Sequence, residues 1–274
     1  EMKERIQKLL GSHSTSSGRF AASPQTGTFH SVCLRILRKE IPLLGYKSNF
    51  SIFDSNDQVS LVKKVMANLE IDPKKYNPNL ILNKISKLKT DLIFPENYNP
   101  TDFFTKIVSR VYNNYQGELK RMNGLDFDDL IVLTVKIFKQ NPDILEKYQN
   151  FWKYILVDEY QDTSHDQYSL VNLLAQKNKN IFAIGDDAQS IYAFRDADIR
   201  NILNFQKDYP DAKVIFLEQN YRSTQNILAA AQNIISNNQT QVPKELWTKN
   251  TKGEKIYVKE TLNERAEADF IVDK

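Results

Sequence analysis

The chain has 274 residues, of which 41% are hydrophobic and 26% charged, and its formal net charge is +3. This length suits two domains better than one, and the composition supports an apolar core. No apolar run approaches the roughly 18 residues that a membrane span needs. Cys33 is the only cysteine, which excludes an internal disulfide and a cysteine-rich zinc site. No secretory leader is recognisable, so a cytoplasmic location is expected.

The eight glycines amount to about 3% of the chain, against a usual value of about 7%. None of them is followed by lysine. The phosphate-binding loop pattern G-x-x-x-x-G-K-[ST] is therefore absent from this sequence.

Charge is distributed unevenly along the chain. Residues 30–125 carry 15 basic and 9 acidic side chains, a net charge of +6, whereas residues 126–213 carry 10 and 15, a net charge of −5. This asymmetry indicates a part that binds a polyanion beside a part with acidic chemistry. The alternative is a solvated, lysine-rich surface.

The first half of the chain is predicted to be mostly helical. Residues 1–10 read as the end of a helix, and residues 11–25 as a loop rich in Ser, Gly and Ala, which is either native or an engineered junction because Gly11-Ser12-His13 resembles a cloning scar. Ser55 is expected to cap a helix. Apolar periodicity predicts helices over residues 31–40, 57–69, 80–88, 103–119 and 128–139, the last ending near Pro142. Cys33 lies among apolar residues and is expected to be buried.

The pattern then changes to short, continuous, β-prone runs. These cover residues 154–157, 181–184 and 214–217, and a helical stretch over residues 166–176 separates the first two. Such runs are typical of a buried parallel sheet in an α/β domain. A further helix over 225–236 is predicted to be capped by Ser223.

Carboxylates follow the ends of these predicted strands, where open α/β sheets bind ligands. Asp158 and Glu159 come directly after the first run. The aspartate can hold Mg²⁺ through oxygen, and the glutamate can orient or deprotonate an attacking water. The alternative is a strand followed by an ordinary polar turn.

Longer strings are more specific. Residues 158–163 read DEYQDT, residues 185–195 read GDDAQSIYAFR, and residues 218–224 read EQNYRST. With these strings the sequence resembles the UvrD/Rep/PcrA-type helicases of superfamily one. Three upstream strings also resemble elements of that family: TFHS at 28–31, LDFDDL at 125–130, and EMKERI at 1–6, which looks like the tail of motif Ia. The resemblance covers the chain except for residues 11–26.

The resemblance implies a cofactor pair, ATP with Mg²⁺, and a role for each matching residue. Asp158 would coordinate Mg²⁺ and Glu159 would activate the hydrolytic water. Gln189 would sense the γ-phosphate and couple it to DNA, Tyr221 would stack on adenine, and Arg222 would place a cation on the γ-phosphate.

The resemblance also implies a DNA-contacting set, which consists of Thr28, Phe29, His30, Tyr192, Phe194 and Arg195. Aromatic faces stack on single-stranded bases without reading sequence, and cations hold phosphates. The expected partners are single-stranded DNA and single-strand/double-strand junctions, with the protein as a monomer. The family usually has glycine after Phe194-Arg195, where this chain has Asp196. This carboxylate either weakens DNA contact or caps the following helix, and the cap is favoured.

The fold implied is α/β, with a RecA-like parallel sheet of the P-loop NTPase type, an inserted helical subdomain and the start of a second RecA-like domain. The expected divisions are residues 1–50 with a loop at 11–26, then 51–125 as the insertion, 126–213 and 214–274. The chain is thus expected to be a fragment of an ATP-dependent 3′–5′ DNA helicase or translocase, inactive alone and with DNA repair as an expected pathway. The alternatives are a non-hydrolytic single-strand-binding remnant and the helicase part of a RecB/AddA-like helicase–nuclease.

Overall fold

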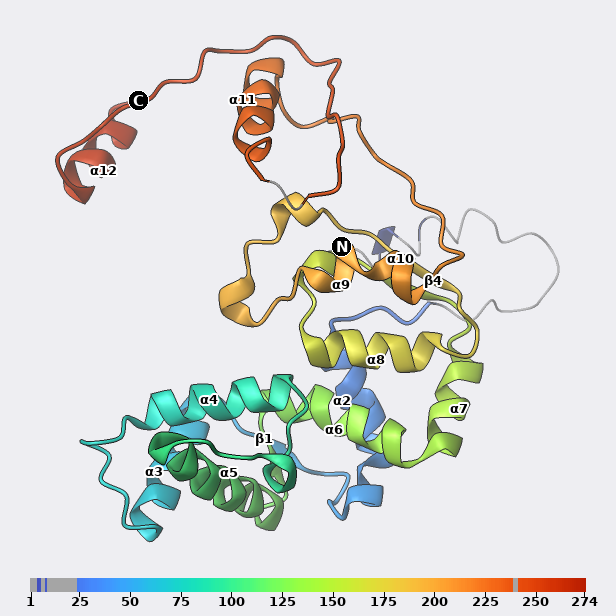
Figure 1. The fold of residues 1–274 in the computed structure, drawn as a ribbon, viewed down its shortest axis with the longest axis vertical. Helices are drawn as coiled ribbons and strands as arrows, with labels where there is room; N and C mark the ends of the chain where they lie inside the picture. Colours follow the sequence, from blue (N-terminus) through green and yellow to red (C-terminus); the bar gives the residue numbers. More distant parts are fainter. Residues whose placement is uncertain (1–3, 6–7, 9–23, 239–240) are drawn as a thin grey trace. The chain divides into compact units, whose positions relative to one another are not determined.

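The computed structural model describes residues 4–5, 8, 24–238 and 241–274, and contacts divide the chain into two units. The first unit comprises the described residues up to Asp186 together with Ser190–Ile202, and the second comprises Asp187–Gln189 and Leu203–Lys274. Figure 1 shows the ribbon. The helix predicted over residues 1–10 and the loop predicted over 11–25 lie mostly outside the described residues. Within the described ranges, no helix is long and apolar enough to cross a membrane.

Helix α6 (Phe127–Gln140) is the centre of one helical group in the first unit. It packs against α2 (Phe29–Glu40) and α8 (His165–Ala175), with α7 (Pro142–Phe151) and the 3₁₀ turn η1 (Ile41–Leu44) beside it. Most of its residues are apolar and buried, because it is covered from several sides. Cys33 is fully buried in this core, as predicted.

A second helical group in the first unit has a core of its own. It comprises α3 (Ser55–Asn68), α4 (Pro78–Thr90) and α5 (Phe103–Arg121), with the 3₁₀ turn η2 (Pro95–Asn97) between α4 and α5. Apolar residues recur at helical spacing in all three helices, which explains why the sequence predicted them. Ser55 was expected to cap α3, but this prediction is wrong: Asp54 accepts from the backbone of Asn56 and Asp57. The extended backbone at Asp54 makes it the N-cap residue, and Ser55 is already the first helical residue.

Two very short strands join the ends of the second helical group. Strand β1 (Ser51–Ile52) pairs in parallel with β2 (Gly124–Leu125), so that Ser51 is opposite Gly124. The chain therefore enters and leaves this group side by side. The predicted division at residues 51 and 125 falls on this pair, and the domain boundaries themselves stay predictions.

The sheet beneath the candidate site has two strands among the described residues. Strand β3 (Ile155–Val157) pairs in parallel with β4 (Ile181–Ala183), as the sequence indicated. The expectation of a buried sheet is only partly met: Leu156 lies opposite Phe182, and the two side chains are 75% and 55% exposed. Residues 214–217 form no strand, and their side chains are exposed. The α/β class is supported, and the RecA-like arrangement stays a prediction.

Proline at residue 142 begins a helix and does not merely end one. Helix α6 ends at Gln140, and Pro142 is the first residue of α7, which the sequence did not predict. Proline is well tolerated at the first helical position, because its missing N–H is one that a helix leaves unbonded there. The predicted end of α6 near Pro142 is confirmed, and the new helix is an addition.

The second unit contains η4 (Asp187–Gln189), α10 (Phe205–Asp208), α11 (Gln225–Ile235) and α12 (Glu264–Val272), and α9 (Arg200–Leu203) spans the division between units. Side chains of α11 bond the chain that follows it: Gln225 and Gln232 donate to the carbonyls of Asn250 and Leu246. Thr224, and not Ser223, is the N-cap residue of α11, without a side-chain bond. The predicted Ser223 cap is therefore wrong.

Candidate nucleotide and nucleic-acid site

The chain turns sharply after β3, and this turn presents two carboxylates to solvent. Asp158 and Glu159 are both exposed, and Glu159 adopts a left-handed backbone conformation with φ 51° and ψ 44°. The Glu159 N–H donates to Asp158 Oδ1 over 3.1 Å. A left-handed backbone is unfavourable for glutamate and persists only when its surroundings hold it, a kind of strain that clusters at functional sites. Carboxylate oxygens are the ligands that Mg²⁺ prefers.

Gln161 links the ends of the two strands, a role that the sequence reasoning missed. Its Nε2 donates to Glu159 Oε2 over 2.8 Å, and its Oε1 accepts from the backbone N–H of Asp186 over 3.0 Å. Gln161 is buried and both bonds are part-buried, so competition from water is reduced. It thereby fixes the Glu159 side chain relative to the turn that follows β4. The only signal for it was its place inside the 158–163 string.

Gly185 lies two residues after the end of β4, and its neighbours leave little space for a side chain. A Cβ added there would lie 2.6 Å from Gln161 Oε1, 2.7 Å from Ile202 Cδ1 and 3.2 Å from the Gln161 backbone nitrogen. The first two contacts are closer than real Cβ contacts, and the third involves backbone that moves little. A side chain at this position would therefore displace Gln161 and Ile202, independently of the φ of Gly185.

We expect Gly185→Ala to lower the free energy of unfolding by about 1–3 kcal/mol, because overpacking forces neighbours out of place. Urea unfolding followed by circular dichroism measures the change. Gly117→Ala is the matched control, since a Cβ there meets nothing within 4 Å and the residue lies inside α5. The control should gain about 0.5–1 kcal/mol, as alanine is the better helix former. If Gly185→Ala and Gly117→Ala both unfold with the same free energy as the unaltered chain, the contact between Gly185 and Gln161 is not tight.

Three of the predicted DNA-contacting residues form one exposed group. Tyr192 precedes the 3₁₀ turn η5 (Ala193–Arg195), and its ring lies 5.8 Å from the Phe194 ring. The Arg195 guanidinium carbon lies 5.6 Å from the Tyr192 centroid and 5.8 Å from that of Phe194. Phe194 is 78% exposed, which is unusual for phenylalanine without a partner. Two aromatic faces beside a cation suit stacking on bases and contact with phosphate.

The other predicted DNA-contacting residues lie at the start of α2 and have structural contacts. Thr28 caps α2, accepting from the Ser31 N–H over 3.3 Å. Phe29 packs partly against the core, and His30 meets the Phe127 ring edge-on at 6.4 Å. Burial lowers the pKa of His30, and the Asp166 charge opposes this only in part. Their DNA roles stay predictions. Among the described residues no group of three His, Cys, Asp or Glu could hold a metal.

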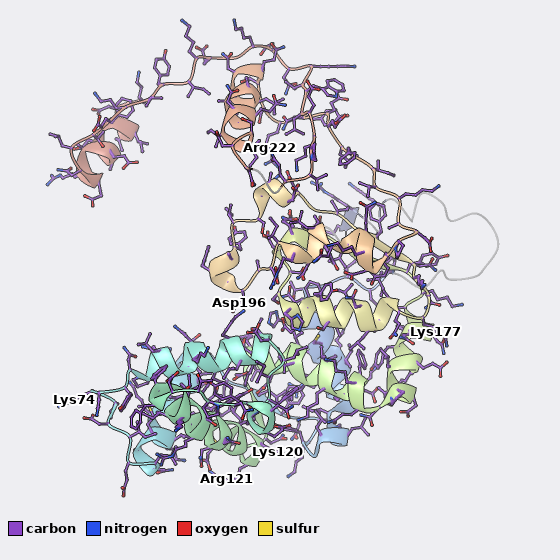
Figure 2. The ribbon with its side chains drawn as sticks, in the orientation of Figure 1. Lys74, Lys120, Arg121, Lys177, Asp196 and Arg222 are labelled. Atoms are coloured by element: carbon purple, nitrogen blue, oxygen red, sulfur yellow. The ribbon has the colours of Figure 1, made fainter. Side chains whose placement is uncertain are left out.

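Asp196 does not cap the following helix, so that prediction is wrong. It adopts φ 65° and ψ 14°, the left-handed region, and it closes η5 through its N–H, which donates to the Ala193 carbonyl over 3.1 Å. Aspartate is among the few residues other than glycine that accept this conformation. Its carboxylate instead forms an ion pair with Lys87 of α4, at 3.1 Å. Figure 2 labels Asp196 on the loop next to α4.

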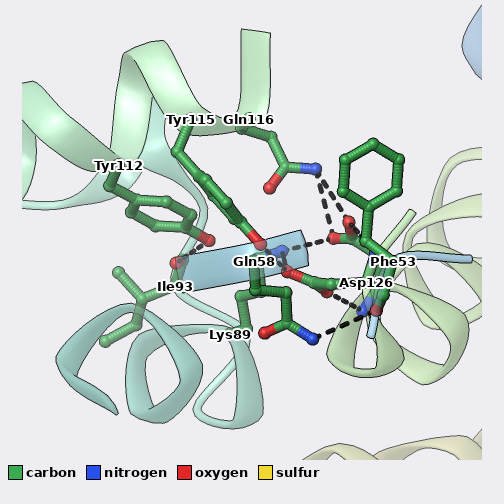
Figure 3. A network of polar contacts seen from close by, with 9 residues as sticks. Phe53, Gln58, Lys89, Ile93, Tyr112, Tyr115, Gln116 and Asp126 are labelled. Atoms are coloured by element: carbon green, nitrogen blue, oxygen red, sulfur yellow. Dashed lines mark hydrogen bonds and ion pairs between the residues drawn. The ribbon is translucent and has the colours of Figure 1, made fainter. Parts of the chain in front are cut away.

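A buried ionic network lies where α4 and α5 meet α6, and the sequence reasoning did not identify it (Figure 3). The Lys89 ammonium lies 2.6 Å from Asp126 Oδ2 and 2.8 Å from Asp129 Oδ1, and all three side chains are at most 2% exposed. Tyr115 donates its hydroxyl to Asp126, and Gln116 donates to Asp129. Every carboxylate of the network thus has a cation and further donors. A lysine directly after Leu88, four residues from Ile85 on the apolar face of α4, was the available signal.

The charges in this network shift the pKa values of both carboxyls. Burial opposes the ionised form of Asp126, but the Lys89 ammonium outweighs it and lowers the pKa of Asp126. Burial and the Asp126 charge together raise the pKa of Asp129 to about 6. Burial likewise opposes the charge on Lys89, but the two carboxylates raise its pKa well above the usual value. The Lys89 ammonium therefore stabilises the ionised form of Asp126, and Asp129 is the more easily protonated of the two carboxyls.

In the second unit, Tyr221 and Arg222 lie on an exposed turn. The Asn220 side chain shapes the turn by accepting from the N–H groups of Arg222 and Ser223, over 3.0 and 2.7 Å. Asn250 Nδ2 donates to the Tyr221 carbonyl over 3.2 Å and holds the turn from the other side. The backbone is therefore fixed, while the Tyr221 side chain is 78% exposed, with its hydroxyl donating to Gln219 Oε1 over 3.0 Å, and the Arg222 side chain is also exposed.

Gln189 is exposed and ends the short turn η4, which belongs to the second unit by its contacts. The turn is anchored through Asp187, whose buried carboxylate pairs with Lys244 at 2.7 Å and accepts from the Val242 N–H over 2.7 Å. Of the predicted site residues, the structure thus joins Asp158 with Glu159, and Tyr192 with Phe194 and Arg195. Gln189, Tyr221 and Arg222 belong to the other unit.

Comparisons with known proteins agree with the family resemblance of the sequence motifs. The family model described as the UvrD/REP helicase N-terminal domain matches residues 1–210, and that of the UvrD-like helicase C-terminal domain matches residues 215–274. The chain is 50% identical over 274 residues to the ATP-dependent DNA helicase PcrA of Staphylococcus aureus strains Mu50 and COL, and 48% identical to that of Staphylococcus epidermidis. In each case 99% of the chain is covered, and it spans 37% of the relative.

Proposed function

We propose a function from one premise: the chain belongs to the UvrD/REP helicase family. The proposed activity is that of an ATP-dependent 3′–5′ DNA helicase or translocase. In such a protein, ATP hydrolysis would drive movement along single-stranded DNA and unwinding at single-strand/double-strand junctions. The observation that carries this proposal is the strained turn after β3, which presents the Asp158 and Glu159 carboxylates and ties Glu159 to Gln161.

The chemistry would be phosphoryl transfer to water, which depends on positioning and charge more than on covalent catalysis. Asp158 would hold Mg²⁺, which neutralises charge on the ATP phosphates when bound. Glu159 would orient and deprotonate the attacking water, with Gln161 restricting its side chain. The exposed carboxylate pair at the end of a parallel strand fits such an ion by donor type.

The remaining nucleotide contacts would come from the second unit. Arg222 would supply a cation to the γ-phosphate, Tyr221 would stack on adenine, and Gln189 would relay the presence of the γ-phosphate. The backbone bonds of Asn220 and Asn250 support this role for the 221–222 turn, because a fixed backbone costs less to order on binding.

DNA would be held by the group of Tyr192, Phe194 and Arg195, with Thr28, Phe29 and His30 contributing at the start of α2. The exposed aromatic pair and the adjacent guanidinium support this assignment. Stacking on such a pair tolerates any base, which suits an enzyme that moves along DNA.

We expect the 274-residue chain to bind a single-stranded oligonucleotide in a salt-dependent manner without appreciable DNA-stimulated ATP hydrolysis. The reason is that its sequence contains no G-x-x-x-x-G-K-[ST] loop to cradle the phosphates. Fluorescence anisotropy measures binding, and phosphate release measures hydrolysis. Turnover that Glu159→Gln abolishes would contradict this expectation.

The same missing loop favours a second candidate function, single-strand binding without hydrolysis. The two are separated by adding ATP with Mg²⁺ to the complex of this chain with DNA. A change in DNA affinity that is lost in Arg222→Gln supports a nucleotide site, whereas no nucleotide effect supports the binding-only function.

A further inference from the structure

An ion pair ties the exposed 192–196 turn, which carries Tyr192 and Phe194, to helix α4. Lys87 Nζ lies 3.1 Å from Asp196 Oδ1, and also 3.1 Å from Oδ1 of Asp91, the C-cap residue of α4. Partial burial lowers the pKa of Lys87, but its bonds to Asp196 and Asp91 outweigh this and raise the pKa above its usual value. Lys87 is therefore a charged partner for the carboxylate of Asp196, the residue that directly follows Arg195.

One end of this pair is rigid. Lys87 is followed by Leu88 and Lys89, which are 4% and 1% exposed, and Lys89 is held by the buried carboxylates of α6. The backbone of α4 at Lys87 therefore cannot shift without disturbing a buried ionic network. An ion pair to Lys87 consequently fixes the position of its partner relative to the packed helices of the first unit.

The other end of the ion pair lies on an exposed turn. The 192–196 turn is closed by three backbone bonds of its own: the N–H groups of Arg195 and Ala197 donate to the Tyr192 carbonyl, and that of Asp196 to the Ala193 carbonyl. No residue of η5 is buried. Asp196 adopts a left-handed backbone conformation, and its carboxylate reaches Lys87 of α4.

We infer that the Lys87–Asp196 ion pair is a latch that holds the 192–196 turn on helix α4, and that Asp196 is a positioning residue for Tyr192, Phe194 and Arg195. The inference rests on the proposed single-strand binding by this turn. Simple electrostatics predicts a different sign: a carboxylate beside Arg195 repels DNA, so removing its charge should strengthen binding. A latch predicts that removing it loosens the turn and weakens binding.

The test uses the 274-residue chain with Asp196→Asn, Lys87→Met and the double variant. Asparagine also accepts a left-handed backbone, so the turn keeps its conformational tolerance. Lys84→Met is the control, because it removes a cation from the same helix one turn earlier. The first readout is hydrogen exchange of the 192–197 amides by mass spectrometry, and the second is the Kd for fluorescein-labelled oligo(dT) by anisotropy.

The latch predicts exchange about two- to fivefold faster in both single variants, the range that an exposed ion pair supports. It also predicts Kd increased about two- to fivefold in each, with the double variant no worse than either, because both changes break the same contact. Lys84→Met should leave exchange unchanged. Binding that tightens in Asp196→Asn and weakens additively in Lys87→Met, with exchange unchanged, would overturn the latch.

The two proposals fail separately. If the unaltered chain does not bind oligo(dT), the proposed DNA role fails, while exchange still decides whether the pair holds the turn. If the chain binds DNA and exchange is equal in all variants, the latch fails and the proposed function stands.

Discussion

Replacing Phe194 by alanine should weaken binding of single-stranded DNA by about 1–3 kcal/mol, a factor of about 5 to 150 in Kd. The ring is 78% exposed and lies against Tyr192 and Arg195, so its loss removes a stacking face without opening the core. Anisotropy with oligo(dT) at several salt concentrations measures the change. The slope of log Kd against log salt should stay the same, because no charge is removed.

Phe103→Ala is the matched control, because Phe103 is 70% exposed in the same unit but lies at the start of α5. It should leave Kd unchanged. Arg195→Gln should instead reduce the salt slope by about 1, as expected for one lost phosphate contact. An unchanged Kd in Phe194→Ala, with normal unfolding, would assign DNA binding to another surface.

Replacing Lys89 by methionine should lower the free energy of unfolding of the first unit by about 3–5 kcal/mol. The change leaves the Asp126 and Asp129 carboxylates buried together without their cation. Urea unfolding measures the loss, which should be smaller at pH 5.5 than at pH 8. Without Lys89 the pKa values of Asp126 and Asp129 should both be raised in the folded state. A carboxyl whose pKa is raised by folding destabilises the folded state more and more as the pH rises from the unfolded-state pKa to the folded-state pKa.

Two further variants make this result interpretable. Lys84→Met should change stability by no more than about 0.5 kcal/mol, because it removes a lysine of the same helix from outside the network. Lys89→Met combined with Asp126→Asn and Asp129→Asn should recover much of the loss, because no charge then stays buried. A triple variant as unstable as Lys89→Met would mean that packing, and not charge, is the reason for the loss.

The helices were predicted from the sequence where apolar residues recur at helical spacing, as in α4 and α6. Their caps were not, because several competent residues stand next to each other and the choice depends on backbone direction: Asp54 and not Ser55, Thr224 and not Ser223. Residues 214–217 have strand propensity without strand structure. Propensity alone does not form a strand without neighbours to pair with.

In the candidate site, too, local features were predicted from the sequence and contacts between distant segments were not. Local strings indicated Asp158, Glu159 and the aromatic turn, because each lies within one short segment. Contacts between distant segments were invisible: Gln161 with Asp186, Lys87 with Asp196, and Lys89 with Asp126. Such contacts depend on how helices pack, which a single sequence does not specify. Asp196 was misread for this reason, since its partner lies on another helix.

The short β1–β2 pair has a consequence for how the molecule can fold and change. By placing Ser51 opposite Gly124, it closes the intervening helices into one long loop whose ends meet. Most contacts of α3, α4 and α5 are made among themselves, so this loop can gain order locally before its ends are joined, and the entropy of closing it rises only slowly with its length. The loops that connect these helices can therefore lengthen or shorten during evolution while the flanking strands keep their register and Lys89 keeps its contacts with α6.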